Sequence, residues 1–231
     1  MFKKENIGSL FDGISNHYDR FNALSSMGID HCWRRQAVKQ LPENCEKLLD
    51  VATGTADLAI TAMKKKRAKS IIGVDLSEGM MAVGREKVAK HGMSDSIVLQ
   101  QANCEALPFE DATFDAIICG YGVRNFANLE GSLAEMYRVL KPNGKVLIME
   151  FSYPTNWFIR GIYNFYFSHI LPLIGKLVVK DGSAMKYFVN SVKQFAKGDA
   201  FVAYLKKAGF VDTTYKNQTF GISVMYSGWK R

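Results

Sequence analysis

Short apolar runs alternate with segments of helical periodicity through the first two thirds of the chain. The apolar runs predict five strands, over 47–52, 70–76, 96–102, 114–120 and 145–151. Amphipathic segments predict helices between them, over 57–66, 78–90 and 129–140. Strands that are apolar on both faces and separated by helices are typical of a parallel sheet built from βαβ units.

The end of the chain has a different pattern. A helix is predicted over 201–210, and two β-rich runs follow it with Gly221 between them. Because the turn at Gly221 is short, these two runs must pair antiparallel. We therefore expect a Rossmann-like α/β fold whose seven-stranded sheet combines five parallel strands with a C-terminal antiparallel hairpin. A dinucleotide dehydrogenase would instead continue its parallel repeat, so the hairpin argues against that class.

One domain is expected over residues 1–231, because no repeat or low-complexity linker divides the chain. We expect a helical cap over 1–40 and a helical insertion, rich in aromatic residues, over 154–197. The insertion contains an apolar stretch, 157–179, that is as long as a membrane span. Polar residues and a proline interrupt this stretch and argue against a span: Arg160, His169, Pro172 and Lys176. Two interpretations of the insertion stay open, ordinary core or the wall of an apolar pocket.

Charge and cysteine usage narrow the class of protein. The net charge of +8 favours an anionic partner, such as nucleic acid, a membrane surface or an acidic substrate. The four cysteines show no spacing suited to zinc, and no metal site is expected. They are typical of reduced thiols, and the N-terminal segment lacks the continuous apolar core of a signal peptide. We therefore expect a cytoplasmic protein.

The segment after the first predicted strand is rich in small residues, as in a ligand-binding turn. Asp50 ends the apolar run, and Gly54 and Thr55 lie in the turn that follows. In an open α/β sheet, ligands bind beyond the carboxyl ends of the strands, where this turn lies. The turn matches neither G-x-G-x-x-G nor the phosphate-binding G-x-x-x-x-G-K-[ST], so NAD and ATP are disfavoured.

Polar residues also end the second and third predicted strands. Asp75 can accept hydrogen bonds from both hydroxyls of a ribose, since Ser77 is available to cap the next helix. Asn103, with Cys104 beside it, supplies an amide that can bind the edge of an adenine. Together with the turn, these residues describe a nucleoside site without a polyphosphate cradle. S-adenosylmethionine fits such a site, and we expect Asp50 to order the loop near its ammonium group.

Longer motifs resemble the ubiquinone/menaquinone biosynthesis C-methyltransferase family from one end of the chain to the other. The N-terminal FDGISNHYDRFNALSSMGIDHCWRR and the turn DVATGTADLA are similar to its patterns. GYGVRN, MYRVLKPNGKVLIMEFS and FYFSHILPLIG follow in the family's order, and YGVRN and FYFSHILPLIG are more selective than the turn. Thr53 and Ala56 stand where the family commonly has glycine, and Gly120 where it often has serine. The resemblance implies a class I methyltransferase fold with S-adenosylmethionine as the methyl donor.

The resemblance further implies methylation of a ring carbon on a prenylated quinol. Demethylmenaquinol is the expected acceptor, with the benzoquinol of ubiquinone biosynthesis as the alternative. Arg124 and Asn125 are expected to be catalytic, with Arg124 stabilising the developing phenolate; a structural salt bridge is the alternative role for Arg124. Tyr18 and Asp19 are expected to close the pocket from the N-terminal side, and His17 is an alternative base.

Two other classes of function compete with this one. A nucleic-acid methyltransferase would match the positive charge, but the Asn/Asp-Pro-Pro-aromatic motif of such enzymes is replaced by GYGVRN, so nucleic acid is not expected as a partner. A non-enzymatic protein that binds adenosylmethionine is disfavoured by the complete set of polar residues at the strand ends. In the favoured interpretation, the aromatic insertion lines a groove for the prenyl tail. The positive charge would then support loose docking on the anionic inner face of a membrane.

Overall fold

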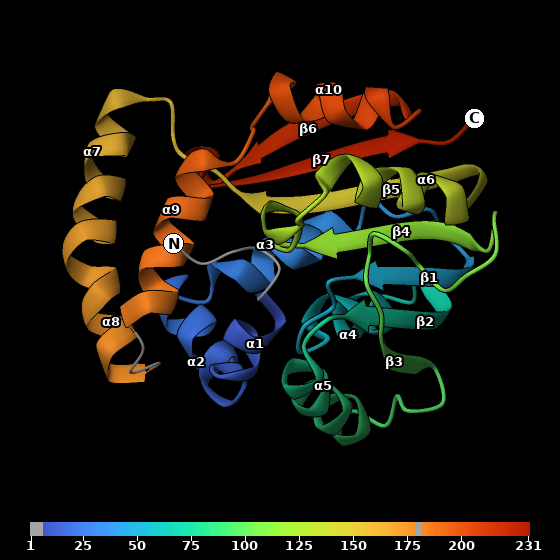
Figure 1. The fold of residues 1–231 in the computed structure, drawn as a ribbon, viewed down its shortest axis with the longest axis horizontal. Coiled ribbons are helices and arrows are strands. Elements are labelled where there is room, and N and C mark those ends of the chain that lie inside the picture. The colour runs from blue at the N-terminus through green and yellow to red at the C-terminus, as the bar shows by residue number, and fades with distance from the viewer. Residues whose placement is uncertain (1–6, 179–181) are drawn as a thin grey trace.

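Seven strands form one sheet in the order β3-β2-β1-β4-β5-β7-β6 (Figure 1). The computed structural model describes residues 7–178 and 182–231. The strands are β1 (Cys45–Val51), β2 (Ala68–Asp75), β3 (Ile97–Gln101), β4 (Phe114–Gly120), β5 (Leu140–Phe151), β6 (Val211–Gln218) and β7 (Ser223–Trp229). Strands β1 to β5 run parallel, and β7 lies antiparallel between β5 and β6. The predicted sheet of five parallel strands and a C-terminal hairpin is confirmed.

The helices between the strands begin close to the predicted residues. In chain order the helices are α1 (Ile7–Asp12), α2 (Ser15–Ser25), α3 (Ile29–Val38), α4 (Asp57–Lys64), α5 (Glu78–Lys90), α6 (Leu129–Val139), α7 (Trp157–Phe165), α8 (Leu171–Val178), α9 (Gly182–Gln194) and α10 (Asp199–Lys207). Ser77 caps α5 as expected, because its hydroxyl accepts a hydrogen bond from the Met80 amide over 3.1 Å.

The fifth strand is longer at its N-terminal end than the predicted 145–151. Strand β5 begins at Leu140, which pairs with Phe114, and the next register pair joins Lys145 to Ala116. The register shifts between these two pairs, and the intervening residues of β5 include Pro142, which has no amide hydrogen for the ladder. The sequence Lys-Pro-Asn-Gly therefore lies within the strand and does not serve only to close the preceding helix.

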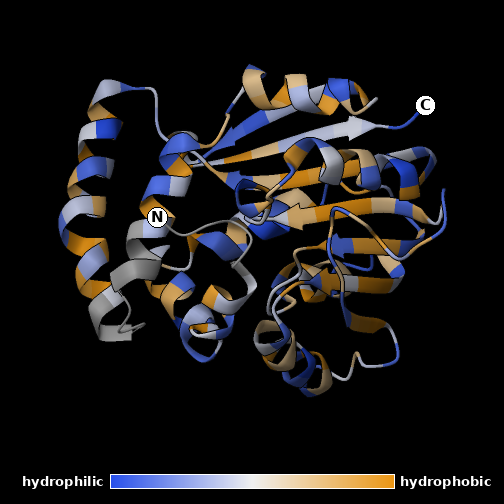
Figure 2. Cartoon of the chain, viewed as in Figure 1, coloured by the Kyte–Doolittle hydropathy of each residue, from blue (hydrophilic) through white to orange (hydrophobic). Residues whose placement is uncertain are grey.

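Two buried clusters fill the two faces of the sheet. One cluster joins α3, α4 and α5 to Leu48 and Ile118, and the other joins α6 and α10 to Leu49 and Ile117. Because successive side chains of a strand point to opposite faces, each adjacent pair contributes one residue to each cluster. Figure 2 shows the hydrophobic positions concentrated in β4 and β5, near the middle of the sheet. Burial on both faces explains why these strands have continuous apolar sequences.

The N-terminal helices and the insertion lie beyond the carboxyl ends of the parallel strands (Figure 1). A π-helical turn, Tyr166–Ile170, joins α7 to α8, and α8 contacts α2. Of the predicted insertion 154–197, residues 179–181 lie outside the described residues. Within the described residues, no helix is both long enough and apolar enough to cross a bilayer. The cap and the insertion thus enclose the end of the sheet where ligands bind in such folds.

Candidate functional site

The loop between β1 and α4 is held from beneath by Asp50, which is almost fully buried. The Thr53 hydroxyl donates a hydrogen bond to Asp50 Oδ2 over 2.8 Å. Ala52, Gly54 and Ala56 adopt φ angles of 55°, 54° and 63°, in the left-handed region. This region is free of strain for glycine but costs about 1–2 kcal/mol for a residue with a Cβ atom. The loop therefore keeps a glycine-like backbone even where alanine replaces glycine.

Asp75 joins this loop to the start of α5. Its Oδ2 accepts a hydrogen bond from the Gly54 amide over 2.8 Å, and its Oδ1 accepts one from the Ser77 amide over 2.9 Å. Burial raises the pKa of Asp75, while these two amides act in the opposite direction. Each carboxylate oxygen keeps a further lone pair that can accept a hydrogen bond from a hydroxyl group of a ligand.

A cavity of about 360 Å³ lies against these strand ends, and we name it the strand-end cavity. The expected donor-binding residues that line it are Gly54, Asp75, Asn103 and Cys104. Asn103 Oδ1 accepts a hydrogen bond from the Glu105 amide over 3.0 Å, which fixes the orientation of the Asn103 side chain. Burial raises the pKa of Cys104 to about 11, so its thiol is neutral near pH 7 and is no nucleophile there.

A smaller cavity of about 50 Å³ lies behind the loop and is lined by Asp50, Thr55 and Tyr121 among others. Asp50 Oδ1 has no hydrogen-bond partner within the described part of the chain. Burial raises the pKa of Asp50 to about 7. A buried carboxylate oxygen without a partner is costly, and a cationic donor removes that cost. Asp50 is thus suited to an ammonium group, and Asp75 to the hydroxyls of a ribose.

A second large cavity, of about 320 Å³, lies between the N-terminal helices and the insertion, and we name it the apolar cavity. Most of its lining is aliphatic or aromatic, including Trp33, Phe151, Ile159, Phe167, Leu171 and Phe188. Among the described residues, Tyr18 and Tyr121 line both this cavity and the strand-end cavity. The two cavities therefore meet at these two tyrosines.

Tyr121 is fixed by contacts on several sides. It adopts a φ of 60°, its ring stacks on Phe151 with centroids 4.2 Å apart, and its hydroxyl lies 3.2 Å from the Ser223 hydroxyl. Burial raises the pKa of Tyr121, so its hydroxyl remains protonated. A bulky residue with positive φ at a ligand site is a sign of local backbone strain.

Asp19 and Thr55 contact each other and line neither large cavity. The Thr55 hydroxyl donates to Asp19 Oδ1 over 2.6 Å, and Lys87 Nζ lies 2.6 Å from Asp19 Oδ2. These contacts fasten α2 to the loop between β1 and α4 and to α5. Both residues thus lie outside the walls of the two large cavities, where they hold the cap in place.

Arg124 and Asn125 follow β4, as predicted, but they have different surroundings. Arg124 Nη1 lies 2.8 Å from Glu150 Oε1 and also donates to the Tyr121 carbonyl oxygen, and Arg124 lines neither large cavity. The structure thus contains the salt bridge that was the alternative role for this arginine. Asn125 does line the strand-end cavity, and its Oδ1 accepts a hydrogen bond from the Tyr187 hydroxyl over 3.0 Å.

A family model for the ubiE/COQ5 methyltransferase family matches residues 1–230. The chain belongs to this family. It is 40% identical over 229 residues to a demethylmenaquinone methyltransferase of Bacteroides fragilis, covering 99% of this chain and 94% of the relative. It is 44% identical over 230 residues to a ubiquinone/menaquinone biosynthesis C-methyltransferase of Geobacter sulfurreducens, covering 99% of this chain and 90% of the relative. The predicted family and the predicted methyltransferase activity are confirmed.

Solved structures support the same fold at lower sequence identity. A SAM-dependent methyltransferase of Thermotoga maritima superposes with a TM-score of 0.68 at 20% identity, covering 97% of this chain and 99% of the other. A second structure of this kind, from Methanococcus maripaludis, gives a TM-score of 0.65 at 19% identity, covering 100% of this chain and 94% of the other. The class I methyltransferase fold is confirmed, and S-adenosylmethionine is the methyl donor of this ubiE/COQ5 family member, as expected.

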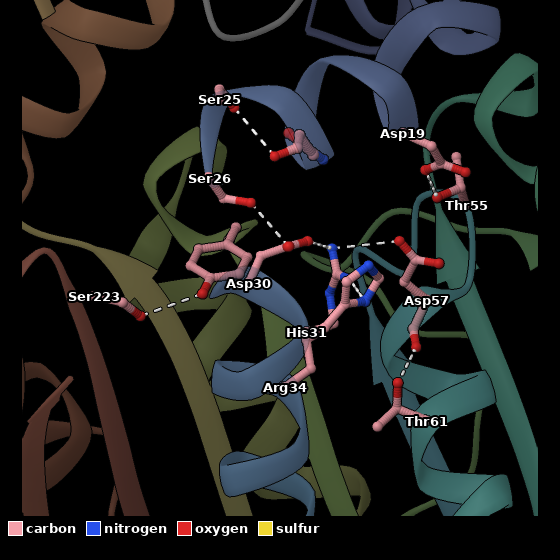
Figure 3. A network of polar contacts seen from close by, with 12 residues as sticks. Asp19, Ser25, Ser26, Asp30, His31, Arg34, Thr55, Asp57, Thr61 and Ser223 are labelled. Atoms are coloured by element: carbon pink, nitrogen blue, oxygen red, sulfur yellow. Dashed lines mark hydrogen bonds and ion pairs between the residues drawn. The ribbon is translucent and has the colours of Figure 1, made fainter. Parts of the chain in front are cut away.

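Two charged residues of the apolar cavity, Asp30 and Arg34, were missed in the sequence. Both come from α3, and Figure 3 shows them in a line of polar contacts that runs from Ser26 to Asp57. Their spacing of four residues places them on the same side of a helix, which was a usable signal. Glu150 was missed as well, although a single acidic residue inside an apolar strand indicates a buried partner.

Proposed function

We propose that this protein transfers a methyl group from S-adenosylmethionine to a ring carbon of a prenylated quinol, with demethylmenaquinol as the acceptor. The observation that carries the proposal is the meeting of two unlike cavities at Tyr18 and Tyr121. One has a carboxylate and an amide suited to a nucleoside, and the other has the apolar lining that an isoprenoid quinol requires. The names of the two relatives described above agree with this acceptor class.

The donor supplies an electrophilic methyl group on a sulfonium ion. A carbon–carbon bond forms to the ring as the sulfur–carbon bond breaks, and the ring carbon then releases its proton. The ring must be electron-rich to attack, so the quinol and not the quinone is the substrate. A phenol has a pKa near 10, so the site must assist the loss of a hydroxyl proton.

Seven of the expected site residues have a direct place in this proposal. Asp75 accepts the ribose hydroxyls, Asp50 receives the ammonium group, and Asn103 with Cys104 borders the adenine. For the acceptor, Tyr18 and Asn125 border the reacting ring from the strand-end cavity. Arg124 does not line the apolar cavity but lies behind two aromatic rings that do. Its guanidinium is 5.5 Å from the Phe151 ring centroid and 5.3 Å from the Phe188 ring centroid.

The prenyl tail is proposed to leave the apolar cavity along an exposed hydrophobic rim. Met27, Ile162 and Phe220 line the cavity and are also 74%, 56% and 76% exposed. Trp157 and Phe158, at the start of α7, add further exposed aromatic surface. Peripheral contact with an anionic bilayer would cover this rim and deliver the substrate, helped by the net charge of +8.

Purified protein with labelled donor tests the proposal directly. Methyl transfer is expected to short-chain demethylmenaquinol kept reduced with dithionite, and not to the same compound held as the quinone. A demethylated benzoquinol in parallel shows whether the ubiquinone series is also accepted, and total RNA tests the competing nucleic-acid class. Transfer to RNA alone, or equal transfer to quinone and quinol, would refute the proposed function.

A further inference from the structure

A cluster of polar side chains interrupts the wall of the apolar cavity at the end of α2 and along α3. It consists of Ser26, Asp30 and Arg34, and Asp30 is the only acidic side chain among the described residues that line this cavity. Asp30 is 5% exposed, so its charge is almost entirely removed from bulk water. A carboxylate in such surroundings requires compensating partners.

Those partners hold Asp30 in one orientation. The Ser26 hydroxyl donates to Asp30 Oδ1 over 2.8 Å, and Arg34 Nη2 lies 2.8 Å from Asp30 Oδ2. Arg34 Nη2 in turn lies 3.3 Å from Asp57 Oδ2, and its Nη1 lies 3.4 Å from His31 Nδ1 (Figure 3). Each Asp30 oxygen has one partner and two lone pairs, so each can accept one more hydrogen bond.

Asp30 lines the cavity that meets the strand-end cavity at Tyr18 and Tyr121. It shares the apolar cavity with Tyr121, the residue that lines both cavities. Burial is the main cause of the raised pKa of the Tyr121 hydroxyl, and the charge of Asp30 raises it further, while Arg34 lowers it. A ring that reaches the junction from the apolar cavity therefore shares that cavity with the Asp30 carboxylate.

We infer that Asp30 accepts a hydrogen bond from a hydroxyl of the reduced acceptor and thereby makes the site selective for quinol over quinone. This inference rests on the proposed function and adds the residue that recognises the redox state. A quinol hydroxyl is a donor that matches a carboxylate, whereas a quinone carbonyl is only an acceptor and is repelled by it. A site built for a substrate hydroxyl discriminates strongly against an analogue that lacks it.

Equilibrium dialysis with a short-chain 2-prenyl-1,4-naphthoquinone tests the inference without relying on turnover. The ligand is measured in air as the quinone and under dithionite as the quinol. Wild-type protein is expected to bind the quinol at least about tenfold more tightly, the effect of one hydrogen bond to a charged group. Asp30→Asn is expected to bring the ratio close to one, because the amide can donate to a carbonyl oxygen.

Asp57→Asn is the matched control. It removes the other carboxylate that pairs with Arg34, but Asp57 does not line the apolar cavity. The quinol-to-quinone ratio is expected to remain as in the wild type. An Asp30→Asn protein that keeps the wild-type ratio, or an Asp57→Asn protein that loses it to the same extent, would overturn the inference.

A second measurement uses only wild-type protein, in case Asp30→Asn does not fold. The two isomeric monomethyl ethers of the naphthoquinol each block one hydroxyl, and one isomer is expected to bind at least about tenfold more weakly than the other. Equal binding of both ethers would contradict a specific hydroxyl contact. Methyl transfer to the quinol in the same preparation tests the proposed function separately, so failure of one does not imply failure of the other.

Discussion

Arg124 and Glu150 form an ion pair in the interior, with both side chains buried and Nη1 only 2.8 Å from Oε1. Glu150 also accepts hydrogen bonds from the backbone amides of Arg124 and Phe151. This carboxylate therefore fixes the segment that follows β4, and with it the backbone next to Tyr121. We therefore expect Arg124 to act on the reaction mainly by keeping the wall of the cavity in place.

Replacing Arg124 should therefore lower stability before it lowers catalysis. Arg124→Ala leaves the Glu150 charge buried without a cation, and loss of one partner of a buried pair costs about 3–5 kcal/mol. We expect that loss in the free energy of unfolding, measured by urea denaturation. The double variant Arg124→Met/Glu150→Gln should recover much of it. A stable Arg124→Ala protein with strongly reduced turnover would instead indicate direct stabilisation of the phenolate.

Removing the charge of Asp75 should weaken donor binding. Asp75→Asn keeps an oxygen for one of the backbone amides but replaces a charged acceptor of the ribose hydroxyls by a neutral one. Hydrogen bonds to charged groups contribute about 1.5–3 kcal/mol, so calorimetry should show at least about tenfold weaker binding of S-adenosylhomocysteine. Glu78→Gln makes the same charge change at the exposed start of α5 and should leave the affinity unchanged.

Donor affinity should rise with pH because the pKa of Asp50 is about 7. Below that pH Asp50 is protonated and cannot pair with an ammonium group. The affinity is therefore expected to increase by roughly tenfold between pH 6 and pH 8, with proton release on binding. Asp50→Asn should remove this dependence, and a wild-type affinity that is flat over this range would contradict the proposed pairing.

The same carboxyl should make the ligand-free protein less stable as pH rises. The pKa of Asp50 is about 7 in the folded protein, against an ordinary value of 3.8 for an aspartate in water, so the folded protein binds the proton more tightly between these values. Stability should therefore fall from about pH 4 to above pH 7, by an upper limit of about 4 kcal/mol from this group. Comparing Asp50→Asn with wild type by thermal denaturation at pH 5 and pH 8 isolates the effect.

Glycine at position 56 should leave the stability of the protein nearly unchanged. Ala56 has a φ of 63°, which glycine adopts without the penalty of about 1–2 kcal/mol for a Cβ atom. Its methyl group is fully buried and contributes about 0.8 kcal/mol, so Ala56→Gly is expected to change the free energy of unfolding by less than about 0.5 kcal/mol. Ala89→Gly, at an exposed position within α5, is the control and should lower it by about 0.5–1 kcal/mol. Equal losses in both variants would show that the loop is not strained at Ala56.

Most of the fold could be predicted because it depends on local patterns. Continuous apolar runs separated by amphipathic segments specify parallel strands, and Asp50, Asp75 and Asn103 come together because parallel strands end at one edge. The acceptor side depends on how separate elements pack. Asp30 lines the apolar cavity because α3 packs near the insertion. Arg124 pairs with Glu150 because β5, which carries Glu150, lies next to β4 in the sheet. No local pattern encodes such distances between elements.

Tyr18 and Tyr121 are the described residues that line both large cavities, so the remaining lining residues of each cavity can be engineered separately. Ile159, Phe167 and Leu171 line the apolar cavity and are absent from the lining of the strand-end cavity. Libraries at these positions can therefore change the size and shape of the accepted aromatic compound without altering the nucleoside contacts. A biocatalyst for regioselective methylation of other hydroxylated arenes would begin from these side chains, with Tyr18 and Tyr121 left in place.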